Sequence, residues 1–299
     1  TLDADFLAAG GKKPLQANFY GTKSGKMTLK SKEEVEQVLA DLEGASYQIS
    51  EVKKGERVKK APLPFTTSTL QQEASKTLNF STQKTMSVAQ QLYEGIDIKG
   101  NGTVGVITYL RTDSTRVSEE AEKAAKTYIS SVYGENYVSK GQNSKASGKK
   151  IQDAHEAIRP TDLSRTPAAL KDSLTREQFR LYQLIWKRFA ASQMSDAVYE
   201  TSSVKIDGGK YRFTMSASRV SFDGFLSVYA QDEEKEGDSR ILKGLSTETE
   251  LTLQQFEQKQ HFTQPPAHYT EAALVKTLEE LGIGRPSTYA PPITTILAR

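Results

Sequence analysis

The chain has 299 residues, enough for two or three domains with buried cores, and no apolar run reaches the roughly 18 residues of a membrane span. It contains no cysteine, which excludes disulfides, a thiol nucleophile and cysteine-bound zinc, and its three histidines leave little material for a histidine-built metal site. The 40 Lys and Arg residues against 37 Asp and Glu residues give a net charge of +3, which permits nucleic-acid binding without arguing for it.

The first part of the chain has the pattern of strands and turns with one helix. Residues 16–20 and 26–30 flank a glycine-rich turn, which is typical of a hairpin. Ser31 is the expected N-cap of a helix that closes at Gly44. Residues 47–58 then return to the alternation of a strand.

After a proline-rich stretch the periodicity becomes helical. Ser68 with Gln71 has the spacing of a capping box at the start of a first helix. A second helix follows after about three residues, so the pair resembles a helix-turn-helix, a geometry that is also common without nucleic acid. We expect residues 104–111 to form a short apolar strand, and Ser118 and Thr175 to cap two further helices.

The last third of the chain changes from strand to helix. Residues 199–256 have a period of two, with a hairpin turn at 207–209. Two prolines end this block, and helices are expected over 271–281 and after Ser287. The start of the last helix stays open, because two early prolines are tolerated only in its first turn or two. Residues 139–150 are interpreted as a polar loop rather than a DNA-binding arm.

The order of these blocks predicts a mixed α+β fold. A strand-rich domain is split into residues 1–64 and 196–264. A helical domain, 65–195, is inserted between its two parts. Residues 265–299 would begin a further helical body that is incomplete here.

Two motifs match known binding patterns only in part, one for a dinucleotide and one for a metal ion. Gly100, Gly102 and Gly105 match the dinucleotide pattern G-x-G-x-x-G, but they lead into a strand instead of opening a helix, so we interpret them as a tight turn. Asp3 and Asp5 are spaced as in an acidic metal loop. No third carboxylate follows at a fitting distance, and a strand is the better interpretation.

Residues 107–114, which read Ile-Thr-Tyr-Leu-Arg-Thr-Asp-Ser, are more unusual. On a strand, Ile107, Tyr109 and Arg111 would share one face, which places a phenol beside a guanidinium. The alternative, which spacing alone favours, is a buried tyrosine with Asp113 paired to an arginine.

Two further clusters contain groups that suit an anionic phosphodiester. His155 and Arg159 lie within five residues of each other, just before a proline. Arg285, Ser287 and Thr288 lie at an expected helix start, where free N–H groups and the helix dipole favour a phosphate. Taken singly, the first cluster could also be a polar cap on a helix end.

Together these clusters resemble bacterial DNA topoisomerase I, a type IA enzyme, over nearly the whole chain. The resemblance implies a toroidal protein in which a strand-rich arch carries a helical domain with the active-site tyrosine. Leu110 follows that tyrosine, and this favours the topoisomerase I branch over the topoisomerase III branch, which usually has proline there. The similarity is carried by residues 64–74, 107–114, 155–160 and 270–290.

The resemblance assigns Tyr109 as the nucleophile. It would attack a backbone phosphorus of single-stranded DNA, form a 5′-phosphotyrosine and release a 3′-hydroxyl. Because a free phenol titrates near pH 10, ionising it at pH 7 costs about 4 kcal/mol. Arg111 would lower that cost and stabilise the phosphorane, and His155 would hydrogen-bond the scissile region. Arg159 would hold either an adjacent phosphate or the local fold.

The remaining expectations concern DNA binding and metal. Arg285, Ser287 and Thr288 would bind phosphate oxygens, and Arg299 matches an arginine just past the last helix. The family's acidic Mg²⁺-binding domain and its zinc ribbons have no counterpart here, so we expect no metal ligand in this chain. The sequence is interpreted as an internal part of a longer enzyme, inactive on its own.

As partners we expect single-stranded and negatively supercoiled DNA, with a monomer in the bacterial cytoplasm, at the nucleoid, and no membrane. A non-catalytic module that binds single-stranded DNA through helix-turn-helix-like pairs is the alternative. The two hypotheses differ in whether an acidic domain precedes this stretch in the whole protein.

Overall fold

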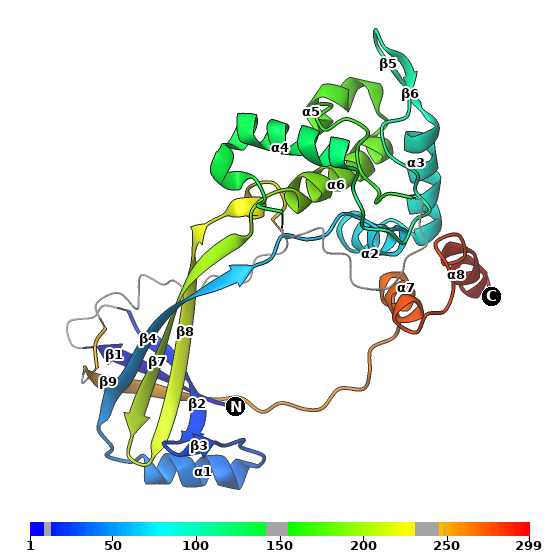
Figure 1. Cartoon of the computed structure of the whole chain (residues 1–299). Coiled ribbons are helices and arrows are strands. Elements are labelled where there is room, and N and C mark those ends of the chain that lie inside the picture. The colour runs from blue at the N-terminus through cyan, green and yellow to red at the C-terminus, as the bar shows by residue number, and fades with distance from the viewer. Residues whose placement is uncertain (9–12, 142–154, 231–244, 248) are drawn as a thin grey trace. The chain divides into compact units, whose positions relative to one another are not determined.

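The computed structural model describes residues 1–8, 13–141, 155–230, 245–247 and 249–299. It confirms the expected mixed α+β class, with a large antiparallel sheet and a set of helices (Figure 1). The chain forms two compact units. We name them the barrel unit, made of Thr1–Lys59, Val198–Phe222 and Asp232–Pro265, and the helical unit, made of Lys60–Ala197, Asp223–Gln231 and Pro266–Arg299. The division of this chain into four segments, 1–64, 65–195, 196–264 and 265–299, stays a prediction.

Antiparallel strands build the barrel unit. Their order in the sheet is β1-β9-β4-β7-β8-β2-β3. Because β1 also pairs with β2, every strand except β3 has a neighbour on both sides, and the sheet closes into a barrel. The strands are β1 (Leu2–Ala8), β2 (Leu15–Thr22), β3 (Gly25–Lys26), β4 (Tyr47–Lys59), β7 (Ala197–Gly208), β8 (Tyr211–Phe222) and β9 (Glu250–Gln258).

The barrel core follows from the two-residue period of its strands. In β1, Leu2, Ala4 and Phe6 are buried and alternate with Asp3 and Asp5, so these two acids lie on a strand, as expected. The inward side chains pack in one cluster, which is closed at one end by α1 (Lys32–Asp41). Residues far apart in the sequence therefore share one core.

In the barrel unit the structure confirms the predicted helix cap and the predicted hairpin turn, and it shows that one predicted strand is wrong. The hydroxyl of Ser31 accepts from Glu34 N at 3.3 Å and caps α1, as expected. The β7–β8 hairpin turns directly after Gly208, where a Cβ would lie 2.3 Å from the Tyr47 ring. The strand expected over residues 26–30 is wrong, because β3 ends at Lys26 and the following residues lead into the α1 cap.

The helical unit is built from helices and one small hairpin. Its core lies along α6, where the buried Tyr182 hydroxyl donates to Arg165 O at 2.6 Å and Trp186 Nε1 donates to Leu163 O at 2.9 Å. The elements are α2 (Thr67–Leu78), α3 (Thr82–Glu94), β5 (Ile96–Ile98), β6 (Gly102–Val104), α4 (Glu119–Tyr133), α5 (Pro167–Leu170), α6 (Arg176–Ser192), α7 (Glu271–Glu280) and α8 (Ala290–Leu297).

The start of α2 corrects one prediction. The capping box is formed by Thr66 and Thr69, and not by Ser68 and Gln71. The hydroxyl of Ser68 is buried instead and donates to Glu279 of α7 at 2.5 Å. Local sequence allowed both registers, and the contacts made with distant segments select this one. The caps expected at Ser118 and Thr175 are confirmed.

Over residues 100–114 the structure confirms the predicted turn and contradicts the predicted strand. Gly100 and Gly102 have φ values of 85° and 70° in the turn of the β5–β6 hairpin, which confirms a tight turn. The strand expected over 104–111 is wrong, because β6 ends at Val104 and only an isolated bridge joins Ile107 to Pro160. The following residues bind several separate segments, and among the described residues no single strand runs beside them.

Two further expectations have an outcome. The double proline lies in the first turn of α8, which begins at Ala290, so the open question about this helix start is resolved. Most of the polar loop expected over 139–150 lies outside the described residues. Within the described ranges, no helix combines the length and the apolar character that crossing a bilayer would require.

Candidate active site

The candidate nucleophile lies on a stretch that we name the tyrosine segment, residues 106–114. Its start is bound to the C-terminal end of α3, because Val106 N donates to Leu92 O at 2.9 Å. Its middle is bound to residues 157–160, because Thr108 N donates to Arg159 O at 2.9 Å. The segment is therefore held from two sides before the chain reaches Tyr109.

Thr67 fixes the backbone on both sides of Arg111. Its buried hydroxyl donates to Leu110 O at 2.7 Å and accepts from Thr112 N at 2.9 Å. Its backbone N–H donates to Thr112 O at 2.9 Å. Since Thr67 is the first residue of α2, this N–H is one that the helix leaves without a partner of its own.

Thr108 does the same for the other neighbour of the tyrosine. Its hydroxyl donates to Ala157 O at 2.7 Å and accepts from Arg159 N at 2.9 Å. The backbone around Tyr109 is thus bound by threonine hydroxyls to α2 and to residues 157–159. Sequence reasoning gave no role to Thr67 or Thr108, although both lie inside the motif blocks.

The Tyr109 side chain projects from this fixed backbone toward solvent. It is 36% exposed, and its ring centroid lies 5.5 Å from that of Tyr93 and 5.0 Å from that of His155. The structure therefore brings His155 to the candidate nucleophile, and the alternative of a buried tyrosine is wrong. The shared face predicted for Ile107 and Tyr109 is also wrong, because Ile107 is buried.

Arg111 is exposed two residues along the same segment. Within the described ranges, neither Asp113 nor any other carboxylate forms an ion pair with it, so the predicted Asp113–Arg alternative is not seen there for Arg111. A guanidinium has five N–H donors in a planar fork that fits phosphate oxygens. The local chemistry therefore offers a phenol and a planar cation on one segment.

Arg159 has a structural partner. Its guanidinium lies 2.7 Å from Glu156, donates to Pro160 O at 2.9 Å, and the side chain is only 13% exposed. Of the two roles expected for Arg159, support of the local fold agrees with these contacts. Binding of a phosphate stays a prediction.

The C-terminal motif block packs against α2, the helix whose first residue holds the tyrosine segment. Glu279 of α7 accepts from Ser68, and Tyr289 is buried. Burial raises the pKa of Tyr289, and the nearby charges of Glu279 and Asp113 raise it further, while Arg285 opposes them.

The predicted phosphate-binding residues of this block are exposed. Arg285 and Thr288 close a turn, with Arg285 N donating to Thr288 Oγ1 at 2.8 Å, and Ser287 lies on the same turn. Arg299 is exposed beyond the end of α8. Among the residues that the structure describes, no hydrogen bond or ion pair joins the Arg299 side chain to the tyrosine segment.

Comparison with known proteins decides the family. A family model described as DNA topoisomerase matches residues 4–299. The chain belongs to the bacterial type IA DNA topoisomerase family. The structure of full-length topoisomerase I from Thermotoga maritima is 37% identical with a TM-score of 0.75, and the match covers 99% of this chain and 46% of that one. The chain therefore spans less than half the length of that relative.

The structure places the four blocks that carry the topoisomerase resemblance in contact. Residues 64–74, 107–114 and 155–160 are joined by the hydrogen bonds of Thr67 and Thr108 and by the bond from Ile158 N to Phe65 O at 2.8 Å. The block 270–290 joins them through Ser68 and Glu279. Blocks that are separate in the sequence thus form one site.

The family is consistent with a need for a divalent metal, and the described residues do not fit one. Histidines and carboxylates never gather in threes within the described ranges. Asp5 accepts from Gln255 Nε2 at 2.7 Å, and Asp3 lies 3.8 Å from Lys259 Nζ. These acids are engaged by neighbouring strand residues, so we derive no chemical step through a metal.

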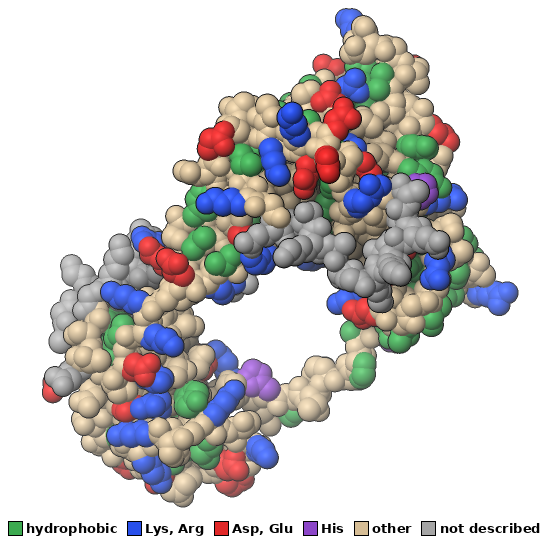
Figure 2. Space-filling view, viewed as in Figure 1, with side chains coloured by type: hydrophobic (Ala, Val, Ile, Leu, Met, Phe, Trp, Pro, Cys, Tyr) green, Lys and Arg blue, Asp and Glu red, His purple; other side chains and the backbone are tan. Residues whose placement is uncertain are grey.

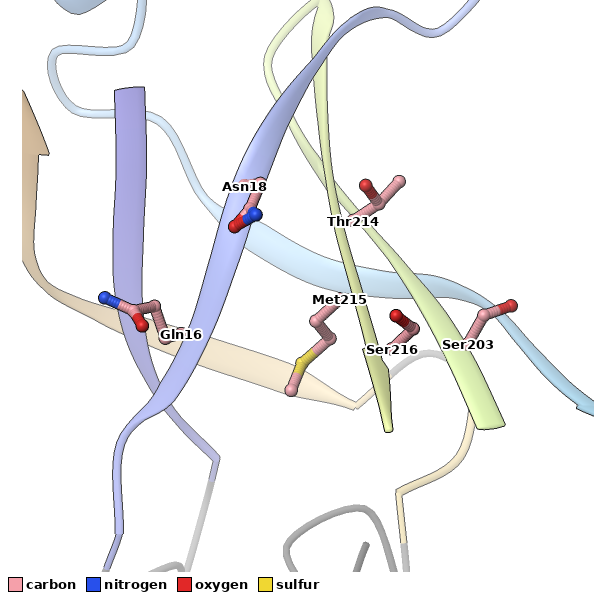
Figure 3. Close-up of a pocket in the computed structure, with 6 residues that line it drawn as sticks. All are labelled: Gln16, Asn18, Ser203, Thr214, Met215 and Ser216. Carbon is pink, nitrogen blue, oxygen red and sulfur yellow. The ribbon is translucent and has the colours of Figure 1, made fainter. Parts of the chain in front are cut away.

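The barrel unit has a pocket of its own, of about 380 Å³ (Figure 3). It is lined by residues of β2, β7 and β8. All of its lining side chains are uncharged at neutral pH. The amides and hydroxyls can donate and accept hydrogen bonds, whereas Met215 has only a weakly accepting thioether. The lining residues are Gln16, Asn18, Ser203, Thr214, Met215 and Ser216.

Proposed function

We propose that the whole protein to which this chain belongs relaxes negatively supercoiled DNA without ATP, by cleaving and rejoining one strand through Tyr109. The observation that carries the proposal is the exposed phenol of Tyr109 on a backbone fixed by Thr67 and Thr108. A fixed backbone with an accessible oxygen suits attack on a bound phosphodiester, because reacting groups held in place lower the entropic barrier. Membership of the topoisomerase family supports the same reaction class.

Cleavage is a transesterification, in which phosphorus exchanges one ester oxygen for another. The Tyr109 Oη–P bond forms while the bond from phosphorus to the 3′ oxygen breaks. The phenol loses its proton, the 3′ oxygen gains one, and a 5′-phosphotyrosine remains. Religation reverses each change, so no energy source is required. Arg111 neutralises charge on the non-bridging oxygens as the phosphorane forms.

The other candidate residues bind the strand. His155 lies against the Tyr109 ring, so its imidazole is placed to hydrogen-bond the scissile region. Arg285, Ser287, Thr288 and Arg299 bind phosphate oxygens of single-stranded DNA, and the protein acts as a monomer in the bacterial cytoplasm, at the nucleoid. Any Mg²⁺ that the reaction needs would be held by residues other than those described here, and it would neutralise further charge. On this proposal the 299-residue chain alone does not relax DNA.

Tyr109→Phe in the full-length enzyme tests the proposal. Removing the hydroxyl abolishes the denaturant-resistant protein–DNA adduct, while affinity for single-stranded DNA stays within about three-fold, because the ring and its neighbours remain. Denaturing gel electrophoresis of a labelled oligonucleotide measures the adduct. Tyr269→Phe, at another exposed tyrosine, is the control and keeps it. An adduct that persists in Tyr109→Phe would mean that a different residue of the enzyme is the nucleophile.

A further inference from the structure

Tyr93 is an exposed aromatic residue near the C-terminal end of α3. Its side chain is 38% exposed, although the helix that carries it buries Val88, Ala89 and Leu92 in the core. A large ring left in solvent beside a candidate active site has a smaller role in the core than these neighbours. The function proposed above gives Tyr93 no part.

The backbone places Tyr93 beside the start of the tyrosine segment. Gly105 passes so close to the end of α3 that a Cβ there would lie 2.5 Å from Tyr93 O. The next residue, Val106, donates its N–H to Leu92 O at 2.9 Å. The hairpin that follows α3 therefore returns the chain against the last turn of the same helix, and this return fixes the distance from Tyr93 to Tyr109.

The two rings meet edge to face. Their centroids are 5.5 Å apart and their planes are inclined by 68°, which is the geometry that aromatic pairs prefer. His155 contacts the Tyr109 ring as well, at 5.0 Å and 38°. A half-exposed tyrosine with no such neighbours would populate several χ1 rotamers, and each of them would place the hydroxyl elsewhere.

We propose that Tyr93 is a positioning residue for Tyr109, whose ring it holds in the orientation that presents the hydroxyl to the scissile phosphate. The proposal rests on the function proposed above. It assigns the effect to the aromatic ring of Tyr93 and not to its hydroxyl. Tyr93 therefore acts through the population of the reactive rotamer, and so on the cleavage rate at saturating DNA.

The test compares three variants of the full-length enzyme in single-turnover cleavage of a saturating oligonucleotide. Tyr93→Leu removes the ring, and the loss of one edge-to-face pair lowers the rate by about 2- to 13-fold, while Kd for the DNA stays within about two-fold. Tyr93→Phe keeps the ring and restores the rate to within about two-fold. Tyr133→Leu is the matched control, because Tyr133 also ends a helix with its ring against another tyrosine, Tyr137, and its rate is unchanged.

Two outcomes would overturn the proposal. Wild-type cleavage by Tyr93→Leu would show that the ring does not position Tyr109. A weaker Kd with an unchanged rate at saturation would show that Tyr93 stacks on a base of the DNA instead. If Tyr93→Leu fails to fold, Tyr93→Met, with a flexible apolar side chain, is read in the same way. Failure of the proposed function is recognised separately, by an adduct in Tyr109→Phe.

Discussion

The β7–β8 hairpin and the tyrosine segment each carry an arginine, and they use it in opposite ways. In the hairpin, Arg212 donates to both oxygens of Asp207, from Nε at 2.7 Å and from Nη2 at 3.0 Å. In the tyrosine segment, Arg111 is exposed and has no carboxylate partner among the described residues. Guanidinium N–H groups that are bonded to a carboxylate of the protein stabilise the fold. Guanidinium N–H groups without such a partner can bind a phosphate.

The same contrast extends over the surface of the barrel unit. Lys210 pairs with Asp41 at 2.8 Å, and Lys205 pairs with Glu51 at 2.6 Å. Basic and acidic side chains are interspersed over the face shown in Figure 2. A net charge of +3 therefore conceals the difference that matters, which is whether a given cation already has an anionic partner. Pairing in the structure, and not composition, distinguishes the cations that remain for DNA.

Substituting the two arginines alike should separate these roles most clearly. Arg111→Lys keeps the charge but loses the planar fork, and we expect cleavage by the full-length enzyme to fall about 10- to 1000-fold, the scale of one lost oxyanion donor. Arg212→Lys is the matched control, and it should cleave within about two-fold of wild type. Single-turnover rates measure both. A near-normal rate for Arg111→Lys would remove this residue from the mechanism.

The pH dependence of stability should report the pair in the hairpin. Burial alone would raise the pKa of Asp207, but the hydrogen bonds and charge of Arg212 outweigh burial and lower it. A carboxyl whose folded pKa is lowered stabilises the fold above its unfolded pKa, about 4, and this contribution is lost as the pH falls through the folded value. Asp207→Asn should therefore cost about 1–2 kcal/mol at pH 7 and less at pH 3, where part of this contribution is lost.

Urea unfolding of the chain at both pH values measures this difference. Asp172→Asn, on an acid for which no ion pair is seen among the described residues, should give nearly the same stability as wild type at each pH. An Asp207→Asn penalty that is equal at pH 7 and pH 3 would show that packing, and not charge, is what the variant loses.

Sequence reasoning succeeded where the signal was local. The caps at Ser31, Ser118 and Thr175 depend on one hydroxyl and an N–H three residues later, so a short window contains the whole interaction. It failed at Ser68, because the partner that buries this hydroxyl, Glu279, lies 211 residues away. It also failed for the strand expected after Val104, whose apolar residues are buried by several separate segments.

The motifs proposed residues for the candidate site but could not give its geometry. Tyr109 and Arg111 were proposed from a motif and stay predictions, and the structure places the other motif blocks near them. The ring contacts of Tyr109 with Tyr93 and His155 could not be read from spacing, because a hairpin and a long loop separate these three residues in the sequence. Thr67 lay within a motif block, but only its bonds to Leu110 and Thr112 reveal what it does.

The smallest expected effect concerns Arg285, which within the described residues forms no ion pair and whose side chain donates to Gly284 O at 3.0 Å. Because each phosphate neutralised releases counterions, binding of single-stranded DNA should weaken with salt, with a log–log slope of about −0.7 per phosphate. Arg285→Ala should reduce the magnitude of that slope by about 0.7.

Arg219→Ala is the matched control, since this exposed arginine already pairs with Glu200 and so has no free charge to give to a phosphate. Fluorescence anisotropy of a labelled oligonucleotide over a salt series measures both slopes on the 299-residue chain. Equal slopes for the two variants would mean that pairing within the protein does not decide which arginines bind DNA, and the contrast between Arg212 and Arg111 would then lose its general meaning. A slope that falls only for Arg285→Ala would extend that contrast from the cleavage chemistry to the binding of the strand.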